Sequence, residues 1–322
     1  MSDNKNKGQN LLIIGVGEAA SKITLDVIKN MNLDYLLVNT KRNSKYISKN
    51  IMIDTSSWIN PSIYKIREAF INQFNKISEI INNYTNIIII GNLASKFGIA
   101  ICPLLANILN YEKEKEIFSF VIMPFGFEKD KIFFSSVALS FIKNFSNSTI
   151  IVDNNSFFKN NPEESFPECY RITNNAIKDV IISACKKGFP DSFNIISTSK
   201  ESEKIENVFY DSMSMLKDSK IANIEKTSIF IYPAKENIDK IDNIIKTVEK
   251  IIDKAEKETT IVTSSKLSKI HLVSKTSNWM FSSYDPLNQF ISKDKMLDYE
   301  PEINQNIKEI SFLQDIETKA FQ

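Results

Sequence analysis

The order of apolar runs and helical patterns in the first 152 residues constrains the fold most. Short apolar runs that are typical of buried strands are followed in turn by stretches whose apolar residues recur at helical spacing. The expected strands are residues 11–14, 35–38, 51–53, 87–90, 118–123 and 149–152. The expected helices are residues 20–31, a long helix opened by Asn60-Pro61 and running to Ile81, residues 99–109 and residues 132–145. Strands that alternate with helices indicate an α/β fold with a doubly wound parallel sheet.

After residue 152 the pattern changes to a long helix and a smaller α+β region. Apolar residues recur at helical spacing from Ile172 to Ala184, and Gly188 ends this helix before an irregular stretch at Phe189-Pro190. The elements expected next are helices near 204–216 and 237–255 and strands at 228–232, 261–263, 270–273 and 279–281. The domain boundaries predicted from this pattern are a flexible tail at 1–10, a nucleotide-binding-type domain at 11–171, a central helix at 172–188, a smaller domain at 189–284 and a C-terminal tail at 285–322.

The composition excludes several functional classes. Lys plus Arg number 40 and Asp plus Glu number 39, so the chain lacks the net positive charge that would favour binding to nucleic acid or to an anionic membrane. Cys102, Cys169 and Cys185 have no paired spacing, which is typical of a reduced cytoplasmic protein. The longest apolar runs are too short to span a bilayer. His271 is the only histidine, so a metal site with several histidines is excluded, and we expect a structural role for this residue.

A candidate phosphate-binding turn follows the first expected strand. Gly15 and Gly17 close the apolar run, and glycine allows both a sharp turn and close approach of a ligand to the backbone. The helix that starts there offers unpaired amide donors and the positive end of its dipole to an anion. The alternative is a tight strand-to-helix turn with no ligand.

The residues after the second expected strand leave an enzyme alternative open. Asn39-Thr40-Lys41-Arg42 stands where a dinucleotide-binding fold places the residue that contacts the ribose. Arg42 would suit the 2′-phosphate of NADP, which would make the chain an NADP-binding oxidoreductase. The simpler interpretation of Arg42 is a basic surface turn.

Taken together, these segments resemble the FtsZ and tubulin superfamily, nearest to its FtsZ and CetZ branch. The resemblance covers roughly residues 11–190, and its motifs occur in the family's order. They are Ile14-Gly15-Val16-Gly17 with Ser21, Val38-Asn39-Thr40, Asn60-Pro61, Pro124-Phe125-Gly126-Phe127-Glu128 and the helix at 172–188. The resemblance implies a GTPase-like domain, a long central helix and a smaller C-terminal domain.

The chain departs from the family most in the signature glycine loop. The family has Gly-Gly-Gly-Thr-Gly-(Ser/Thr)-Gly, whereas this chain has Ala94-Ser95-Lys96-Phe97-Gly98. Residues with a Cβ that were held in a left-handed conformation would cost about 1–2 kcal/mol each. Phe97 also puts an aromatic ring where the resemblance places phosphate oxygens. We therefore expect GTP or GDP binding of reduced affinity.

The resemblance assigns nucleotide-binding roles by position. If binding is retained, the contacts are Gly15, Gly17, Ser21, Lys22, Asn39, Lys41, Ser95, Lys96, Gly98, Glu128, Lys131, Lys178 and Asp179. In the family, hydrolysis needs a loop with paired carboxylates after the central helix, and here Asp191 is the sole acid between 188 and 198. We expect little GTP hydrolysis, no catalytic residue beyond a weak case for Asp191, and no bound metal.

The function implied by the resemblance is that of a divergent cytoskeletal or cell-division protein of archaeal type. It would associate with itself or with another filament of the family. Its C-terminal tail carries Ile307, Ile310, Phe312, Leu313 and Ile316, and either binds a partner or docks on its own core. A further alternative is a structural partner that binds no nucleotide and never polymerises alone.

Overall fold

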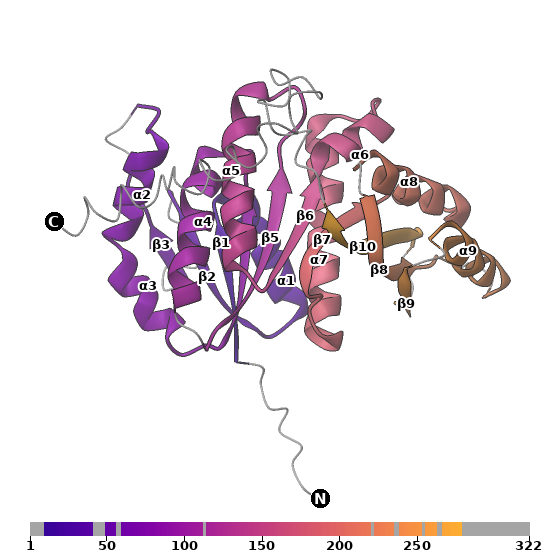
Figure 1. The fold of residues 1–322 in the computed structure, drawn as a ribbon, viewed down its shortest axis with the longest axis horizontal. Helices are drawn as coiled ribbons and strands as arrows, with labels where there is room; N and C mark the ends of the chain where they lie inside the picture. Colours follow the sequence, from indigo (N-terminus) through magenta and orange to yellow (C-terminus); the bar gives the residue numbers. More distant parts are fainter. Residues whose placement is uncertain are drawn as a thin grey trace, which may run out of the picture. The chain divides into compact units, whose positions relative to one another are not determined.

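A single sheet organises the part of the chain that the structure describes. The computed structural model describes residues 10–40, 49–55, 59–111, 114–219, 222–234, 238–252, 255–262 and 266–278. Ten strands in these ranges pair in the order β3-β2-β1-β4-β5-β6-β7-β10-β8-β9 (Figure 1). Sequential strands that lie on both sides of β1 define the doubly wound topology expected from the sequence.

The first seven strands all run parallel to one another. They are β1 (Leu11–Val16), β2 (Asp34–Asn39), β3 (Asn50–Met52), β4 (Asn86–Asn92), β5 (Glu116–Met123), β6 (Ser148–Asp153) and β7 (Ser192–Thr198). The central strands are runs of isoleucine, valine and leucine because both faces of a parallel sheet are covered by helices.

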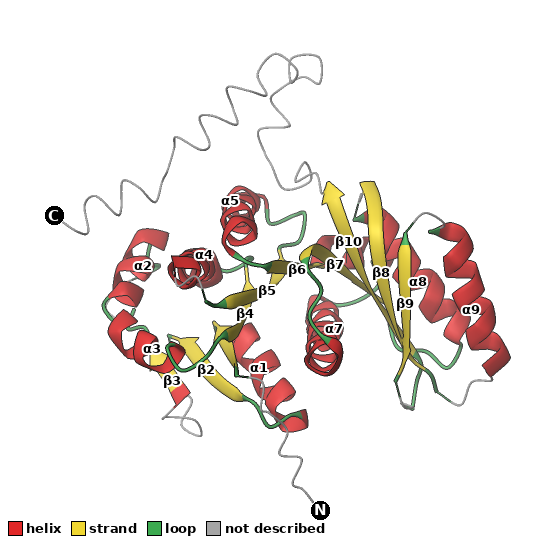
Figure 2. Ribbon diagram, turned by 60° about the horizontal axis from the view of Figure 1, so that its bottom comes forward, coloured by secondary structure: helices red, strands yellow, loops and turns green. Residues whose placement is uncertain are grey.

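Helices cover both faces of this parallel region. Helices α1 (Glu18–Asn30) and α7 (Phe166–Lys187) lie against one face, and α4 (Lys96–Tyr111) and α5 (Lys129–Phe145) lie against the other (Figure 2). The connections also contain α2 (Ile63–Ile71), α3 (Phe74–Ile81) and α6 (Asn154–Asn160). The core between the sheet and α1 and α7 is apolar throughout, so it fixes α7 against the strands.

The rest of the described chain extends the sheet with antiparallel pairing. Strand β10 (Lys269–Asn278) runs antiparallel to both β7 and β8 (Ala222–Tyr232), and β9 (Glu256–Ile261) pairs parallel to β8 at the edge. Helices α8 (Ile205–Asp218) and α9 (Ile238–Ile251) share a second apolar core with β8 and β10.

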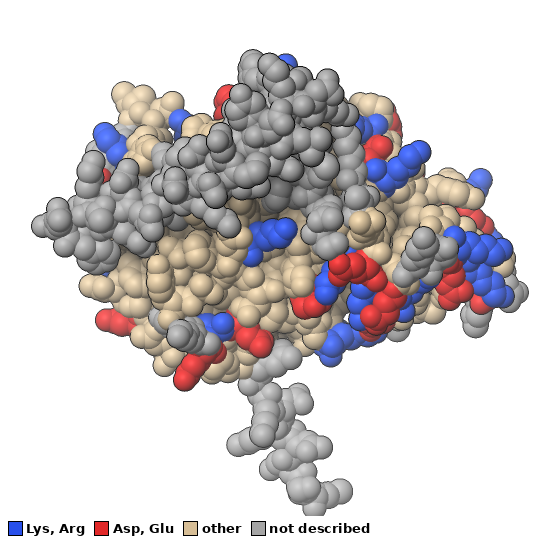
Figure 3. Space-filling model, viewed as in Figure 1, with Lys and Arg blue, Asp and Glu red and all other residues tan. Residues whose placement is uncertain are grey.

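The charged side chains of the described surface are mixed in sign. In Figure 3, Lys and Arg lie among Asp and Glu on the visible face. Exposed ion pairs contribute to this mixing, for example Lys226 with Glu256 at 2.9 Å and Lys187 with Glu258 at 3.6 Å. Among the described residues, that face therefore presents no extended patch of one sign, in keeping with the near-zero net charge of the sequence.

The predicted α/β class and the parallel sheet are confirmed, but the long helix that we expected to end at Ile81 is wrong. Two helices, α2 and α3, occupy the stretch and are interrupted at Asn72 and Gln73. Asparagine favours turns because its side chain competes for backbone hydrogen bonds. Pro61 lies outside α2, since the hydroxyl of Ser62 caps that helix by accepting from the amide of Lys65 at 3.3 Å.

The region around the central helix also differs from the expectation. The helix begins at Phe166 rather than 172, with Ser165 as its cap, and the short α6 before it was not predicted. The predicted irregular stretch is confined to residues 188–191, because 192–198 form β7 between β6 and β10. The strand expected at 261–263 instead occupies 256–261. The strand expected at 279–281 lies outside the described residues.

Candidate functional site

The expected ligand edge of the sheet is formed by the loops that follow β1, β2, β4, β5 and β6. Because these strands are parallel, their carboxyl ends meet at one edge. The amide of Asn39 donates to the hydroxyl of Ser21 at 3.2 Å, which joins the loop after β2 to α1. The structure therefore brings together the predicted residues of the first two loops.

The turn after β1 depends on Gly17. Its φ of 86° and ψ of 175° are open to glycine and closed to residues with a Cβ. The Gly17 amide donates to the carbonyl of Val38 at 2.9 Å, and its carbonyl accepts from Ser21 as the first bond of α1. The backbone amide that the resemblance offers to a phosphate is therefore already bonded to β2.

The loop after β4 satisfies its own hydrogen bonds. The Asn92 side chain accepts from the Ala94 amide at 2.8 Å, and the Asn92 carbonyl accepts from the Ser95 amide at 3.2 Å. The Ser95 hydroxyl donates to the same carbonyl and accepts from the Gly98 amide at 3.0 Å. Two amides of the loop, those of Ala94 and Ser95, and one amide in the first turn of α4, that of Gly98, therefore have partners within this segment.

The backbone of this loop avoids the conformation that would have made its side chains costly. The described residues outside glycine that have positive φ are Asn60, Ser192 and Asn223, and none of them lies in 92–98. The left-handed strain considered for Ala94 to Phe97 is therefore absent. Gly98 is retained for packing, because a Cβ there would collide with the carbonyl oxygen of Asn92.

The ring of Phe97 lies beside the turn after β1. Its Cδ1 is 3.6 Å from the position that a Cβ on Gly17 would occupy, and the side chain is only partly exposed. The ring is therefore a neighbour of the turn where the resemblance places phosphate.

The charged side chains at this edge bond to their neighbours. Lys22 pairs with Glu18 at 2.9 Å on the exposed face of α1, and Lys96 donates to the side chain of Asn60 at 2.7 Å. Glu18 puts a carboxylate in the first turn of α1, where it interacts favourably with the helix dipole. A phosphate bound at the same end of α1 would be repelled by the Glu18 carboxylate.

The loop after β5 is also closed on itself. One carboxylate oxygen of Glu128 accepts from the amide of Phe125 at 3.0 Å, and the other pairs with Lys131 at 2.5 Å. The Gly126 amide donates to the side chain of Asn155 at 2.9 Å. Glu128 and Lys131, both predicted to contact a nucleotide, therefore stabilise the turn that leads into α5.

Asp179 belongs to a buried polar network on the side of α7 that faces the antiparallel strands. Its carboxylate contacts Lys269 and the Nε2 atom of His271, the latter at 3.2 Å, and Lys178 lies 3.2 Å from its second oxygen. The Nδ1 atom of His271 is 2.9 Å from the hydroxyl of Thr198. The network joins α7 to β7 and β10, so Asp179 faces the antiparallel part of the sheet.

The titration of this network is set by burial and charge. Burial raises the pKa of Asp179, but hydrogen bonding and the charges of His271 and Lys269 outweigh it and hold this pKa below its usual value. Burial lowers the pKa of His271, although the Asp179 carboxylate opposes the shift. His271 thus is buried and has an acidic partner that its sequence context did not reveal, and its structural role stays a prediction.

Two asparagine side chains that the sequence did not point to have buried atoms without a hydrogen-bond partner in the part of the chain that the structure describes. Asn154, which is fully buried, and the partly buried Asn174 each have a side-chain atom that lacks a hydrogen-bond partner in the described structure. Asn154 begins α6, which was not predicted, so no signal in the sequence pointed to it. Asn174 lies one helical turn before Lys178 on α7, a spacing that the sequence does contain.

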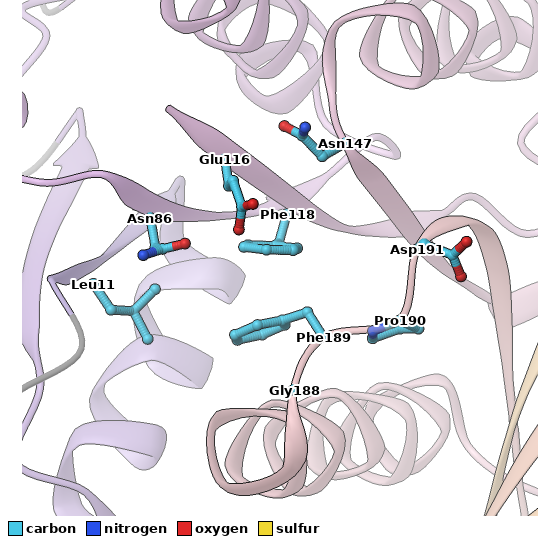
Figure 4. Close-up of a pocket in the computed structure, with 9 residues that line it drawn as sticks. All are labelled: Leu11, Asn86, Glu116, Phe118, Asn147, Gly188, Phe189, Pro190 and Asp191. Atoms are coloured by element: carbon cyan, nitrogen blue, oxygen red, sulfur yellow. The ribbon is translucent and has the colours of Figure 1, made fainter. Parts of the chain in front are cut away.

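Asp191 lies at the opposite edge of the sheet. It pairs with Lys275 at 2.8 Å, and this hydrogen bond holds its pKa below the usual value. Figure 4 shows it beside a cavity of about 370 Å³ at the amino ends of β1, β4 and β5, whose apolar part is formed by Leu11, Phe118, Phe189 and Pro190. A neighbouring cavity of about 320 Å³ between α7 and the antiparallel strands shares residues 188–191 with it.

Several predicted features fall outside the part of the chain that the structure describes. Lys41, Arg42, residues 279–284 and the apolar tail residues 307–316 lie outside the described residues. Within the described ranges, no cluster of three or more His, Cys, Asp or Glu side chains is arranged to hold a metal ion. None of the described helices combines the length and hydropathy needed to cross a membrane.

Comparison with solved structures identifies the fold. CetZ from Methanosaeta thermophila superimposes with a TM-score of 0.63 at 15% identity, covering 96% of this chain and 99% of that one. An empty FtsZ dimer from M. jannaschii gives 0.67 at 15% identity over 87% and 92%. CetZ2 from Haloferax volcanii, a GTPγS-bound protofilament, gives 0.59 at 14% identity over 87% and 97%. No family model and no curated protein matches the chain. The chain therefore has the fold of the FtsZ and tubulin superfamily.

Proposed function

We propose that this chain is a scaffold or filament protein of the FtsZ-like type that associates with itself or with a related filament and does not switch through GTP. The observation that carries the proposal is the ring of Phe97 beside Gly17, at an edge where the amides of Gly17, Ala94 and Gly98 already have partners. In a nucleotide-driven filament, release of phosphate changes loops that the nucleotide had ordered. Loops that are held in place by their own side chains would not change when phosphate is released.

The hydrogen bonds of the loops set the size of the loss in nucleotide affinity. A phosphate would have to displace the bond from the Ala94 amide to the Asn92 side chain and the bond from the Gly98 amide to the Ser95 hydroxyl. Two charge-assisted bonds forgone, at about 1.5–3 kcal/mol each, weaken binding by roughly two to four powers of ten. Reduced affinity for GTP or GDP is therefore part of the proposal.

The arrangement of Asp191 supports the loss of hydrolysis. It is the sole carboxylate between residues 188 and 198, and Lys275 occupies it. A water molecule would need a carboxylate that is available as a base. We infer that the chain has no GTPase activity by the family's route, and the absence of paired cysteines fits a cytoplasmic location.

The comparisons favour self-association over the oxidoreductase alternative. The similar structures include an FtsZ dimer and a CetZ2 protofilament, and each covers at least 87% of this chain. The NADP alternative rests on Arg42, which lies outside the described residues, whereas the solved structures named above are CetZ and FtsZ proteins. The cell-division role and the archaeal origin implied by the resemblance stay predictions, as do the domain boundaries at 171, 188 and 284.

The test is sedimentation of the full chain with and without GTP, together with release of phosphate. We expect the same concentration-dependent assemblies in both conditions and no phosphate above the level without protein. Assembly that requires GTP, or steady phosphate release that the Gly17→Val variant abolishes, would overturn the proposal. Addition of NADPH provides the third arm, in which we expect no fluorescence change on mixing.

A further inference from the structure

The only histidine of the chain lies where three elements meet. On β10, the Nε2 atom of His271 is 3.2 Å from a carboxylate oxygen of Asp179 on α7, and its Nδ1 atom is 2.9 Å from the hydroxyl of Thr198 on β7. Its sequence neighbours Ile270 and Leu272 belong to the core shared with α8 and α9, so the imidazole lies on the opposite face of β10. One buried ring therefore joins α7, β7 and β10.

The hydrogen bonds of His271 define its neutral form. An ionised carboxylate only accepts, so Nε2 carries the hydrogen that Asp179 accepts, and Nδ1 accepts from the hydroxyl of Thr198. A proton added to Nδ1 turns this nitrogen into a donor, and the Thr198 hydroxyl must then donate to another acceptor. The carbonyl of Ser199 is 3.5 Å away, which makes a long bond. Protonation of His271 therefore weakens the hydrogen bonding of the network.

The charges that face His271 are mostly positive. Among the described residues, the acid that contacts the ring is Asp179, and its carboxylate is shared with Lys269 on β10 and Lys178 on α7. Strand β8 contributes Tyr232, whose ring centroid is 5.3 Å from that of the imidazole, and burial raises the pKa of this phenol to about 12, which keeps it neutral. Strand β7 has no titratable side chain. A protonated His271 would therefore make three cations around one carboxylate.

Burial and positive charge both oppose protonation of His271 within the folded chain. Burial is the main cause that holds its pKa below 6.5, Lys269 and Lys178 add to the shift, and Asp179 opposes it without outweighing it. In a conformation that exposes the ring to water, the pKa returns to about 6.5. Because the exposed ring binds the proton more tightly, acid favours a conformation in which His271 has left this site.

The antiparallel strands have a core that does not depend on α7. Strands β8 and β10 share this core with α8 and α9. Strand β10 pairs with β8 from Lys269 to Asn278, whereas it pairs with β7 only from His271 to Lys275. The shorter pairing is the weaker of the two, so the antiparallel strands are able to move away from β7 and α7 while their own core stays intact.

We propose that His271, Asp179 and Thr198 form an acid-sensitive latch, which holds the antiparallel strands against α7 and β7 and opens when Nδ1 of His271 binds a proton. This inference goes beyond the proposed function, since it concerns contacts within one chain and needs neither a second copy nor a nucleotide. For an exposed imidazole that titrates at about 6.5, a change from pH 7.5 to pH 5.5 raises the ratio of open to closed chains by up to about tenfold.

The experiment is hydrogen exchange of the full chain, read by mass spectrometry of its peptides, at pH 7.5 and pH 5.5. The matched control is His271→Gln, because a glutamine amide also donates and accepts hydrogen bonds but does not titrate. Comparing the two chains at the same pH removes the intrinsic pH dependence of exchange. At pH 7.5 they should exchange alike, and at pH 5.5 β7 and β10 should exchange up to about tenfold faster in the unmodified chain. Strands β1 and β4 should not differ.

Equal exchange of β7 and β10 in the two chains at pH 5.5 would overturn the latch. An acceleration that is as large in β1 and β4 would also overturn it, because the acid effect would then be global unfolding.

A second measurement does not depend on the variant. Because His271 is the only histidine, a chain with labelled histidine gives one imidazole signal in the NMR spectrum. Its titration should have a midpoint below pH 6.5 and coincide with faster exchange of β10 relative to β1 and β4 in the unmodified chain. A midpoint at 6.5 or above, or a titration without any change in β10, would overturn the latch.

Discussion

The buried network around Asp179 predicts a large cost for removing one carboxylate. Asp179, Lys269 and His271 have side chains that are 9%, 13% and 3% exposed. The Asp179→Asn substitution keeps the shape of the side chain but removes the carboxylate that pairs with the mostly buried Lys269, which also lies over the ring of Tyr232. The network links α7 to β10, so the substitution acts on the contact between the central helix and the antiparallel strands.

The magnitude follows from the burial of the pair. Breaking a buried ion pair by removing one partner costs about 3–5 kcal/mol, because the other charge is left uncompensated. The matched control is Asp191→Asn, since Asp191 pairs with Lys275 while its side chain is 73% exposed. An exposed pair of this kind is worth about 0–1 kcal/mol. The two variants should therefore differ by about 2–5 kcal/mol.

Urea unfolding of the two variants and the unmodified chain is the assay. With a slope of about 1–3 kcal/mol per molar urea, the Asp179→Asn variant should unfold at a midpoint lower by about 1 M or more than the Asp191→Asn variant. Equal midpoints for the two variants would show that the Asp179 network does not stabilise the fold, and the reasoning from burial would fail.

The pKa of His271 and the backbone of Gly17 give two further predictions. The pKa of buried His271 lies below its usual 6.5, so as the pH falls the imidazole takes up its proton in the unfolded chain before it does so in the folded chain. The stability that this residue contributes should therefore be complete above pH 6.5 and decline as the pH falls below it. Urea midpoints at pH 7.5 and pH 5.5 measure the decline. A midpoint that does not change over this range, or a decline that persists in a His271→Gln variant, would contradict the assignment. The Gly17→Ala variant should lose about 1–3 kcal/mol, because its φ of 86° strains any residue with a Cβ; a melting temperature equal to that of the unmodified chain would count against the conformation described for this turn.

The parallel half of the fold was predictable because its signals are local. Runs such as Ile87–Ile90 and Phe118–Met123 are long enough, and apolar enough, to identify buried strands without reference to the rest of the chain. Strand β7 was missed because it follows Gly188 and Pro190 and begins with polar Ser192. Its place in the sheet is set by pairing with β6 and β10, which are distant in sequence.

The candidate site shows the same division between local and distant information. The sequence located Gly17 and Phe97 in the two loops that meet, since each follows a strand that periodicity identifies. It could not show that the amides after β4 would be capped by Asn92 and Ser95, because that depends on the conformation of the turn. Asp179 was placed by alignment to a family motif, whereas its direction is decided by His271 and Lys269 almost a hundred residues later.

The most direct test of the account is a calorimetric titration of the full chain with GTP in the presence of Mg²⁺. The edge formed by Phe97, Asn92 and Ser95 predicts binding too weak to saturate at micromolar concentrations of GTP. Binding of one GTP per chain that saturates at micromolar concentrations and that the Gly17→Val variant abolishes would contradict the account.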